Sequence, residues 1–288
     1  MDTTPNNFLD IDPELAVYSA ARYAILPIPY EATVCYQTGT RLGPAAIIAA
    51  SQQVEFSDEL LGAGYLQAGI TTLDAIPPNA AGPEAMHQDI YRVARAAVSD
   101  GKFLIGLGGE HGVTSALVRA VIEKHPKLSI LQIDAHADLR DTYQGTPFSH
   151  ASVMRRVLEM GATIVPVGVR SFSEEEARFM RETGIEPITP RRVRHDPDWI
   201  DVALAGLGAA VYVTIDIDAF DPAYAPGTGT PEPGGLDWFQ VCDLLARVSK
   251  ERTVVAADIV EVMPIPGQVV TEFLAARLAC KLIAMTAG

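Results

Sequence analysis

Short apolar runs rich in β-branched residues recur along the whole chain and predict the strands of a sheet. The predicted strands are Tyr23–Ile28, Lys102–Leu107, Leu128–Ile133, Thr163–Val169, Ala210–Ile215 and Thr253–Val260. Between the strands, apolar residues follow helical spacing, as in Val241, Leu244, Leu245 and Val248, and in Val270, Leu274 and Leu278. Because strands that alternate with helix-length segments form βαβ units, the pattern predicts an α/β fold with a mostly parallel sheet and helices on both faces.

Two local signals predict where helices begin, and the chain shows no internal boundary. Asp12-Pro13 and Asp196-Pro197 each combine an N-cap residue with a first-turn proline, so we expect a helix to open at each pair. No repeat, low-complexity tract or linker interrupts the 288 residues. We therefore expect one domain over residues 1–288, with residues 1–20 as an N-terminal extension that could lie at an oligomer contact.

Composition narrows the class of protein. The formal net charge of −14 leaves no basic surplus to displace phosphate counterions, which argues against nucleic-acid binding. No apolar stretch approaches the length of a membrane span, and the acidic first twenty residues do not resemble a signal peptide, so we expect a cytoplasmic protein that does not associate with membranes. Cys35, Cys242 and Cys280 are far apart in the sequence and are expected to be buried thiols in a reducing compartment.

Acidic and histidine side chains follow three of the predicted strands. Asp134-Ala135-His136-Ala137-Asp138 follows one strand, Asp216-Ile217-Asp218 follows another, and His111 comes shortly after a third. Parallel sheets place ligands outside the carboxyl ends of their strands, so we expect these groups to meet on one side of the sheet. The polar connections Leu139–Ser149 and Pro226–Gly235 are expected beside them.

Four aspartates that lie close together require cations to offset their negative charge. Two like charges about 4 Å apart repel each other by roughly 4 kcal/mol at an effective dielectric constant of 20. Two divalent ions would offset four aspartates, whereas one would leave a large imbalance. Carboxylates and imidazoles without a thiolate favour manganese-like ions over structural zinc. The sequence therefore predicts a two-metal hydrolase site made from six side chains: His111, Asp134, His136, Asp138, Asp216 and Asp218.

These motifs resemble those of the ureohydrolase family of arginases and agmatinases, and their details are most similar to bacterial and archaeal agmatinases. The matching segments run from about Ala24 to Lys281 and include Gly39 to Pro44, Leu107 to His111, Ile130 to Asp138, Pro147 to His150, Thr214 to Asp218, and Glu261 to Pro264. The resemblance implies an arginase-like three-layer α/β/α fold. It also implies two Mn²⁺ per subunit and a homo-oligomer, either a trimer or a hexamer.

The resemblance further implies the roles of individual residues. One metal would be held by His111, Asp134, Asp138 and Asp216, and the other by Asp134, His136, Asp216 and Asp218. A hydroxide bridging the metals would attack the guanidinium carbon, releasing urea and an amine. Asp138 would accept a hydrogen bond from this hydroxide, Glu261 would hold the guanidinium, and His150 would transfer a proton to the departing amine.

The chain departs from the common family pattern at a few positions that are not ligands. Glu110 stands where an aspartate is frequent, and Gly112 where relatives commonly have serine. Ala151 replaces a glycine found in many agmatinases, and Met263 stands where asparagine or serine is common. These departures bear on substrate contacts more than on the metal ligands.

The identity of the guanidine is left open by the sequence. Agmatine is the first choice, N1-aminopropylagmatine is close behind, and a guanidino acid such as guanidinobutyrate remains an alternative. Arg140 is the only basic residue of the 139–149 loop, and Asp141 and Tyr143 are candidates to meet an amine tail. Two other classes are a single-zinc deacylase of the same fold and a catalytically silent paralogue. The complete set of site residues argues against both.

Overall fold

A parallel sheet forms the centre of the computed structural model, which describes residues 6–59 and 61–287. Within these residues the sheet has seven strands in the order β2-β1-β3-β7-β6-β4-β5, all paired in parallel. The strands are β1 (Tyr23–Ile28), β2 (Ile70–Thr72), β3 (Phe103–Gly108), β4 (Leu128–Ile133), β5 (Thr163–Val167), β6 (Ala210–Asp216) and β7 (Thr253–Val260). The predicted strands are confirmed to within two residues at each end, and β2 is an additional short edge strand.

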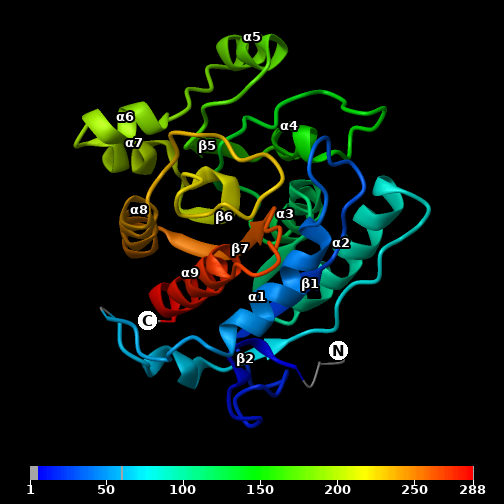
Figure 1. The fold of residues 1–288 in the computed structure, drawn as a ribbon, viewed down its shortest axis with the longest axis vertical. Coiled ribbons are helices and arrows are strands. Elements are labelled where there is room, and N and C mark those ends of the chain that lie inside the picture. Colours follow the sequence, from blue (N-terminus) through cyan, green and yellow to red (C-terminus); the bar gives the residue numbers. More distant parts are fainter. Residues whose placement is uncertain (1–5, 60, 288) are drawn as a thin grey trace.

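Helices cover both faces of the sheet (Figure 1). They are α1 (Gly43–Ser51), α2 (Pro83–Ser99), α3 (Thr114–Ile122), α4 (Val153–Glu159), α5 (Glu174–Thr183), α6 (Pro190–His195), α7 (Trp199–Gly206), α8 (Trp238–Glu251) and α9 (Val270–Thr286). The α/β fold expected from the sequence is therefore confirmed. In the described part of the chain, no helix combines the length and the apolar character that crossing a membrane requires.

Alternation of side chains along the strands divides the core into two halves. Ile25 and Ile105 pack on one face with residues of α1, α7, α8 and α9, whereas Leu26 and Leu104 pack on the other face with residues of α2, α3 and α4. Successive side chains of a strand point to opposite faces, so a strand that is apolar at every position must be buried on both faces. This explains why the strands are continuous apolar runs.

Two local expectations about helices were wrong. Asp12-Pro13 is followed by turns rather than by a helix, because the apolar spacing needed to hold a helix against the core is missing there. At Asp196-Pro197 the helix begins two residues after the proline, at Trp199, and Asp196 instead caps the end of α6. The predicted extension over residues 1–20 falls partly on residues 1–5, which lie outside the described residues.

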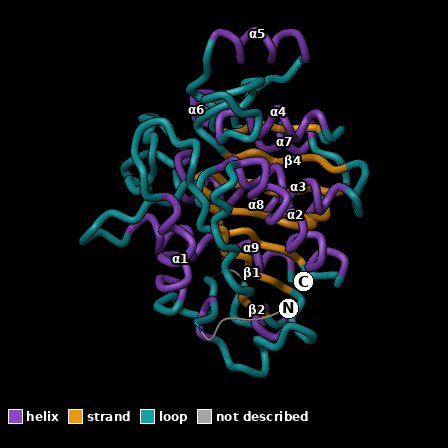
Figure 2. Tube along the Cα trace, turned by 90° about the vertical axis from the view of Figure 1, so that its right-hand side faces the viewer, coloured by secondary structure: helices purple, strands orange, loops and turns teal. Residues whose placement is uncertain are grey.

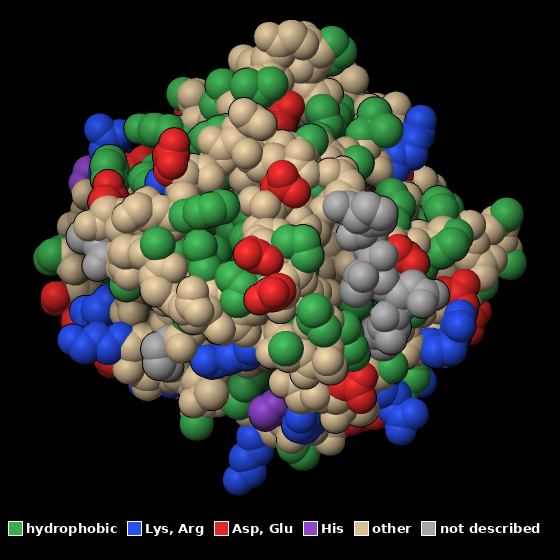
Figure 3. Space-filling model, turned by 90° about the horizontal axis from the view of Figure 1, so that it is seen from below, with side chains coloured by type: hydrophobic (Ala, Val, Ile, Leu, Met, Phe, Trp, Pro, Cys, Tyr) green, Lys and Arg blue, Asp and Glu red, His purple; other side chains and the backbone are tan. Residues whose placement is uncertain are grey.

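The surface around β2 carries charges of both signs. Seen from below Figure 1, acidic side chains gather near the middle of this face and lysine and arginine side chains lie towards its edge, with hydrophobic side chains scattered between them (Figure 3).

The expectation that all three cysteines are buried was wrong: Cys242 and Cys280 are buried, but Cys35 is exposed. Cys35 belongs to a loop after β1, where chain connections are solvent-accessible.

Most of the long loops lie at one end of the strands (Figure 2). The segments that follow β3, β4, β6 and β7 contain the acidic and histidine residues singled out in the sequence. The sheet order puts β7 between β3 and β6, and β4 next to β6. Four adjacent strands therefore deliver their following residues to the same place.

Candidate metal and active site

Strand register brings the two acidic motifs together. β4 and β6 are paired up to Ile133 and Ile215, so Asp134 and Asp216, which come next, lie side by side at the carboxyl edge of the sheet. Neighbouring strands are about 4.8 Å apart, which places the two carboxylates within reach of one cation. Residues after Asp216 turn into a short 3₁₀ helix, Ile217–Ala219, that presents Asp218 to the same side.

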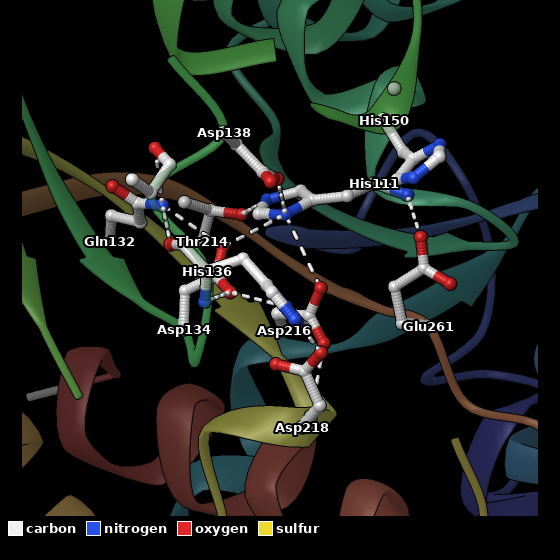
Figure 4. A network of polar contacts seen from close by, with 12 residues as sticks. His111, Gln132, Asp134, His136, Asp138, His150, Thr214, Asp216, Asp218 and Glu261 are labelled. Atoms are coloured by element: carbon white, nitrogen blue, oxygen red, sulfur yellow. Dashed lines mark hydrogen bonds and ion pairs between the residues drawn. The ribbon is translucent and has the colours of Figure 1, made fainter. Parts of the chain in front are cut away.

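His111 faces three of the carboxylates. Its Nδ1 atom lies 3.2 Å from Asp134 Oδ2, 3.1 Å from Asp138 Oδ2 and 3.4 Å from Asp216 Oδ2 (Figure 4). The histidine is 1% exposed, and Nδ1 has no hydrogen-bond partner among the described residues. A buried nitrogen surrounded by carboxylate oxygens is the environment that a divalent cation would satisfy.

The other ring nitrogen of His111 shows which atom carries the proton. Thr214 Oγ1 donates to Asp258 Oδ1 at 2.6 Å and lies 2.9 Å from His111 Nε2. Since the single hydroxyl proton goes to Asp258, Thr214 can only accept from the imidazole, so Nε2 carries the hydrogen. In the neutral imidazole that a metal requires, Nδ1 is left with a lone pair directed at the carboxylates, as in a metal ligand whose second nitrogen is fixed by a hydrogen bond.

A second cluster lies next to the first. His136 Nδ1 is 2.9 Å from Asp218 Oδ2 and 3.8 Å from Asp134 Oδ1. Asp134 thus belongs both to the group with His111 and Asp216 and to the group with His136 and Asp218. The structure brings all six predicted side chains together: five form these two sets, which share Asp134, and Asp138 joins the first through its 3.1 Å contact with His111.

The acidic cluster cannot keep its full negative charge by itself. Burial, followed by the charge of Asp134, raises the pKa of Asp138 to about 7. Burial and the charge of Asp218 raise the pKa of Asp216 well above its usual value. Asp218 raises the pKa of His136 to about 11, although burial opposes this. Protons therefore occupy these groups when no metal is bound, and metal ions would replace them.

Glu261 enters the site from the end of β7. Its Oε1 accepts the backbone N–H of His111 at 2.6 Å, and its own N–H donates to Gly109 O at 2.8 Å. Glu261 and Asp138 have φ angles of 61° and 54°, in the left-handed region that costs a non-glycine residue about 1–2 kcal/mol. Backbone strain of this kind persists where the surroundings over-determine it, most often at functional sites.

A cavity of about 260 Å³ opens above the clusters. Five of the six predicted metal ligands line it, and Glu261 and His150 lie in the same wall. His150 begins a 3₁₀ helix, His150–Ser152, and its Nδ1 is 3.1 Å from Thr33 Oγ1. Burial, and then the positive charges of His111 and His136, lowers the pKa of His150 to about 4, which favours its neutral form.

The outer wall of the cavity is rich in aromatic residues. It includes Tyr36, Tyr143 and Phe172, and the ring of Tyr143 lies 5.6 Å from that of His150 in an edge-on arrangement. Arg140 also lines the cavity, with its guanidinium 5.1 Å from the Tyr143 ring centroid. Of the two residues expected to meet an amine tail, Tyr143 is in the wall.

Asp141, the other candidate, is engaged elsewhere. Its Oδ1 accepts from Arg156 at 2.9 Å, its side chain is 61% exposed, and it is absent from the cavity wall. An exposed carboxylate already paired with arginine is a poor partner for a substrate amine. The tail contact expected for Asp141 is thus not supported by its position.

Several residues that organise the site were not identified from the sequence. Gln132 donates its side-chain amide to Asp134 Oδ2 at 2.9 Å, and Asp258 supports Thr214 as described above. Arg170 donates to the backbone carbonyls of Asp218 and of residues in the 226–235 loop. The available signal was a polar residue inside an apolar strand, such as Gln132 or Asp258, where burial demands a partner.

Comparisons with known proteins agree with this geometry. The model of the arginase family matches residues 21–285. An N(1)-aminopropylagmatine ureohydrolase of Synechocystis sp. is 39% identical, covering 97% of this chain and 93% of the relative. An agmatinase of Pyrococcus horikoshii is 37% identical, covering 93% of each chain. The crystal structure of agmatine ureohydrolase of Thermoplasma volcanium superimposes with a TM-score of 0.86 at 33% identity, covering 94% of this chain and 92% of that one.

The family match spans nearly the whole chain, and the relatives cover it to a similar extent. The resemblance drawn from the sequence motifs is therefore confirmed: the chain belongs to the arginase family and is an agmatinase-like amidinohydrolase.

Proposed function

We propose that this chain hydrolyses the guanidinium group of a small amine-tailed guanidine to urea and an amine, using two Mn²⁺ ions. The observation that carries the proposal is the pair of histidine–carboxylate clusters that share Asp134 beneath a cavity walled by Glu261 and His150. The lone pair of His111 Nδ1, buried among carboxylates without a hydrogen-bond partner, supports the metal-binding part of the proposal.

Six side chains would hold the two ions: His111, Asp134, His136, Asp138, Asp216 and Asp218. The absence of a thiolate and the mixture of imidazole and carboxylate ligands suit Mn²⁺ better than structural zinc. When bound, such a pair supplies the Lewis acidity that lets water ionise near neutral pH. The protein contributes fixed ligand orientation, through the hydrogen bonds that Thr214 and Gln132 make to His111 and Asp134.

Three residues would handle the substrate and the protons. Glu261 would bind the guanidinium, since one of its oxygens is already fixed by the backbone of His111 and the other is left for the ligand. Asp138 would hold a proton of the nucleophilic water. His150, neutral and in the cavity wall, would first take up a proton from water in the cavity and then pass it to the departing amine.

The tail of the substrate would lie along the aromatic outer wall. Tyr36, Tyr143 and Phe172 line this wall, and an aromatic ring attracts an ammonium group by about 0.5–2 kcal/mol. Agmatine was the first choice from the sequence. The 39% identity to the Synechocystis sp. relative, an N(1)-aminopropylagmatine ureohydrolase, supports our ranking of N1-aminopropylagmatine ahead of agmatine, and its longer tail could contact more of this wall.

A guanidino acid is the second candidate, and Arg140 is the observation in its favour. This arginine lines the cavity and could meet a carboxylate tail. However, its Nε lies 3.9 Å from Glu176 Oε2, so the charge of the arginine is already partly offset. Because Arg140 is already paired with Glu176, we rank guanidino acids below amine-tailed guanidines as substrates.

Urea release from a panel of guanidines tests the proposal. N1-aminopropylagmatine, agmatine, guanidinobutyrate and arginine would be compared by kcat/KM with Mn²⁺ present, then after chelation, and then after Mn²⁺ is restored. We expect N1-aminopropylagmatine and agmatine to have the highest kcat/KM. Activity should be lost on chelation and recovered when Mn²⁺ is restored. Absence of urea from every guanidine would refute the proposal and support a deacylase or a silent paralogue. Preference for guanidinobutyrate would refute the tail assignment alone.

Quaternary structure remains a prediction from the family resemblance. We expect a homo-oligomer, a trimer or a hexamer, and light scattering coupled to size-exclusion chromatography would measure its mass. A monomeric mass at micromolar concentration would contradict it.

A further inference from the structure

Two positions beside His111 depart from the common family pattern: Glu110 bonds Thr33, and Gly112 lies next to the backbone of His150. Glu110 is fully buried, and its Oε2 accepts the backbone N–H groups of Ala32 and Thr33, each at 2.7 Å. Its Oε1 accepts the hydroxyl of Thr33 at 3.0 Å. The carboxylate therefore fixes both the backbone and the side chain of Thr33.

The hydroxyl of Thr33 is used to its full capacity. A hydroxyl has one proton and two lone pairs, and the proton is donated to Glu110. One lone pair accepts the backbone N–H of His150 at 3.1 Å, and the other faces His150 Nδ1, also at 3.1 Å. Because Thr33 has no second proton to give, Nδ1 must be the donor in that contact.

A longer contact from Ser149 does not alter this assignment. Its hydroxyl lies 3.4 Å from His150 Nδ1, against 3.1 Å for Thr33. At such a distance a neutral hydrogen bond is weak. Ser149 therefore offers a natural control: if it were the partner of Nδ1, its removal would have the larger effect.

Gly112 explains why Glu110 can reach Thr33. A Cβ atom at position 112 would lie 3.2 Å from Glu110 Oε1 and 3.3 Å from the backbone nitrogen of His150. Both contacts are closer than side chains normally make, so a serine here would require the carboxylate or the loop of His150 to shift by a few tenths of an ångström. The glutamate at 110 and the glycine at 112 are thus two parts of one local arrangement.

We infer that Thr33 and Glu110 are positioning residues that hold neutral His150 in the tautomer with hydrogen on Nδ1, leaving the Nε2 lone pair free for proton transfer. The polar side-chain contacts of the ring, with Thr33 and Ser149, are made through Nδ1, and the ring lies in the cavity wall. A proton can then be added to Nε2 and removed from it while Nδ1 keeps donating to Thr33. The ring need not turn over during the reaction. This inference rests on the proposed proton-transfer role of His150.

Kinetics of matched variants test the inference. Thr33→Val keeps the shape of the side chain and removes the hydroxyl, whereas Thr33→Ser keeps the hydroxyl. We expect Thr33→Val to lower kcat by on the order of tenfold or more, with KM and bound manganese unchanged, and Thr33→Ser to retain most of kcat. Glu110→Asp, which withdraws the carboxylate, should lower kcat in the same way. Ser149→Ala should have little effect.

A second background separates positioning from a general structural effect. In His150→Asn, Thr33→Val should cause no further loss of kcat, because the residue that it positions is gone. An equal fractional loss in both backgrounds would overturn the inference. So would a larger loss from Ser149→Ala than from Thr33→Val.

Nitrogen spectra test the tautomer without relying on activity. The chain has six histidines, and His150→Asn identifies the signals of this ring in ¹⁵N-histidine-labelled protein carrying diamagnetic Zn²⁺. In the wild-type protein we expect hydrogen on Nδ1 of His150 and none on Nε2. This preference should be lost in Thr33→Val. A hydrogen on Nε2 would overturn the inference. If the wild-type protein released no urea, the proposed function would fail, and these spectra would still decide the inference.

Discussion

Replacing Thr214 by valine tests whether hydrogen bonding behind His111 controls metal affinity. Valine has nearly the same shape, so packing within β6 is kept while the hydroxyl is lost. That hydroxyl joins His111 Nε2 at 2.9 Å to Asp258 Oδ1 at 2.6 Å. Tyr212, which donates to the other oxygen of Asp258 at 2.6 Å, remains in place.

The size of the effect follows from burial. His111 is 1% exposed and Asp258 is fully buried, so water cannot replace the missing hydroxyl. A buried polar group left without its partner costs about 1–3 kcal/mol, which is the expected loss in the free energy of unfolding of the metal-free protein. Loss of a hydrogen bond that orients a metal-binding histidine typically weakens metal affinity roughly 10- to 100-fold, or about 1.4–2.8 kcal/mol.

Manganese titration measures the second quantity. Urea release would be followed against free Mn²⁺ in a metal buffer, with elemental analysis of the dialysed protein as an independent count of bound ions. Thr214→Ser is the control, since it keeps the hydroxyl and should bind nearly as tightly as the wild type. Wild-type affinity in Thr214→Val, or an equal loss in Thr214→Ser, would refute the reasoning.

Four further predictions concern the remaining parts of the site. Asp138→Ala should abolish turnover and leave the circular dichroism spectrum largely unchanged; normal activity would exclude a ligand role. Glu261→Gln, which can still accept the His111 N–H, should lower kcat/KM by roughly 10- to 100-fold through lost charge pairing with the guanidinium, and an unchanged value would contradict that contact. Arg170→Lys should reduce the free energy of unfolding in urea by about 1–3 kcal/mol, because a lysine cannot donate to the carbonyls of Asp218 and Glu232 at the same time. An unchanged midpoint of unfolding would argue against this role of Arg170. Manganese affinity should fall as the pH is lowered through about 7, because protons then occupy the carboxyl of Asp138, and a pH-independent affinity from pH 6 to 8 would be inconsistent with proton competition.

The effect of pH on the stability of the metal-free protein follows from the raised pKa of Asp138. Its folded-state pKa is raised above the usual value of an aspartate, so the metal-free folded protein binds a proton that the unfolded chain has already released near neutral pH. This group therefore lowers the stability of the metal-free protein as the pH rises from about 4, the usual pKa of an aspartate, to about 7, where the loss is nearly complete. Thermal unfolding of the metal-free protein at two pH values would measure this, with Asp138→Asn as the variant in which this contribution is absent.

The strands and the six clustered side chains could be predicted from local patterns in the sequence. Continuous apolar runs such as Leu128–Ile133 can only be buried on both faces, so they had to be central strands of a covered sheet. The acidic motifs come directly after such runs, and parallel strands share a carboxyl edge. The short β2 was missed because three residues give too little periodicity, and Asp12-Pro13 was misjudged because a cap signal alone does not hold a helix.

The groups that support these side chains, by contrast, depend on how distant segments of the chain pack together. Asp258 lies opposite Thr214 because β7 pairs with β6, and no local pattern shows that the last strand inserts beside β6 rather than at an edge. Likewise, Thr33 reaches His150 across 117 residues of sequence. Hydrogen bonds between distant segments depend on strand order and loop path, which long-range packing sets, whereas burial pattern and the residues that follow each strand are local properties of the chain.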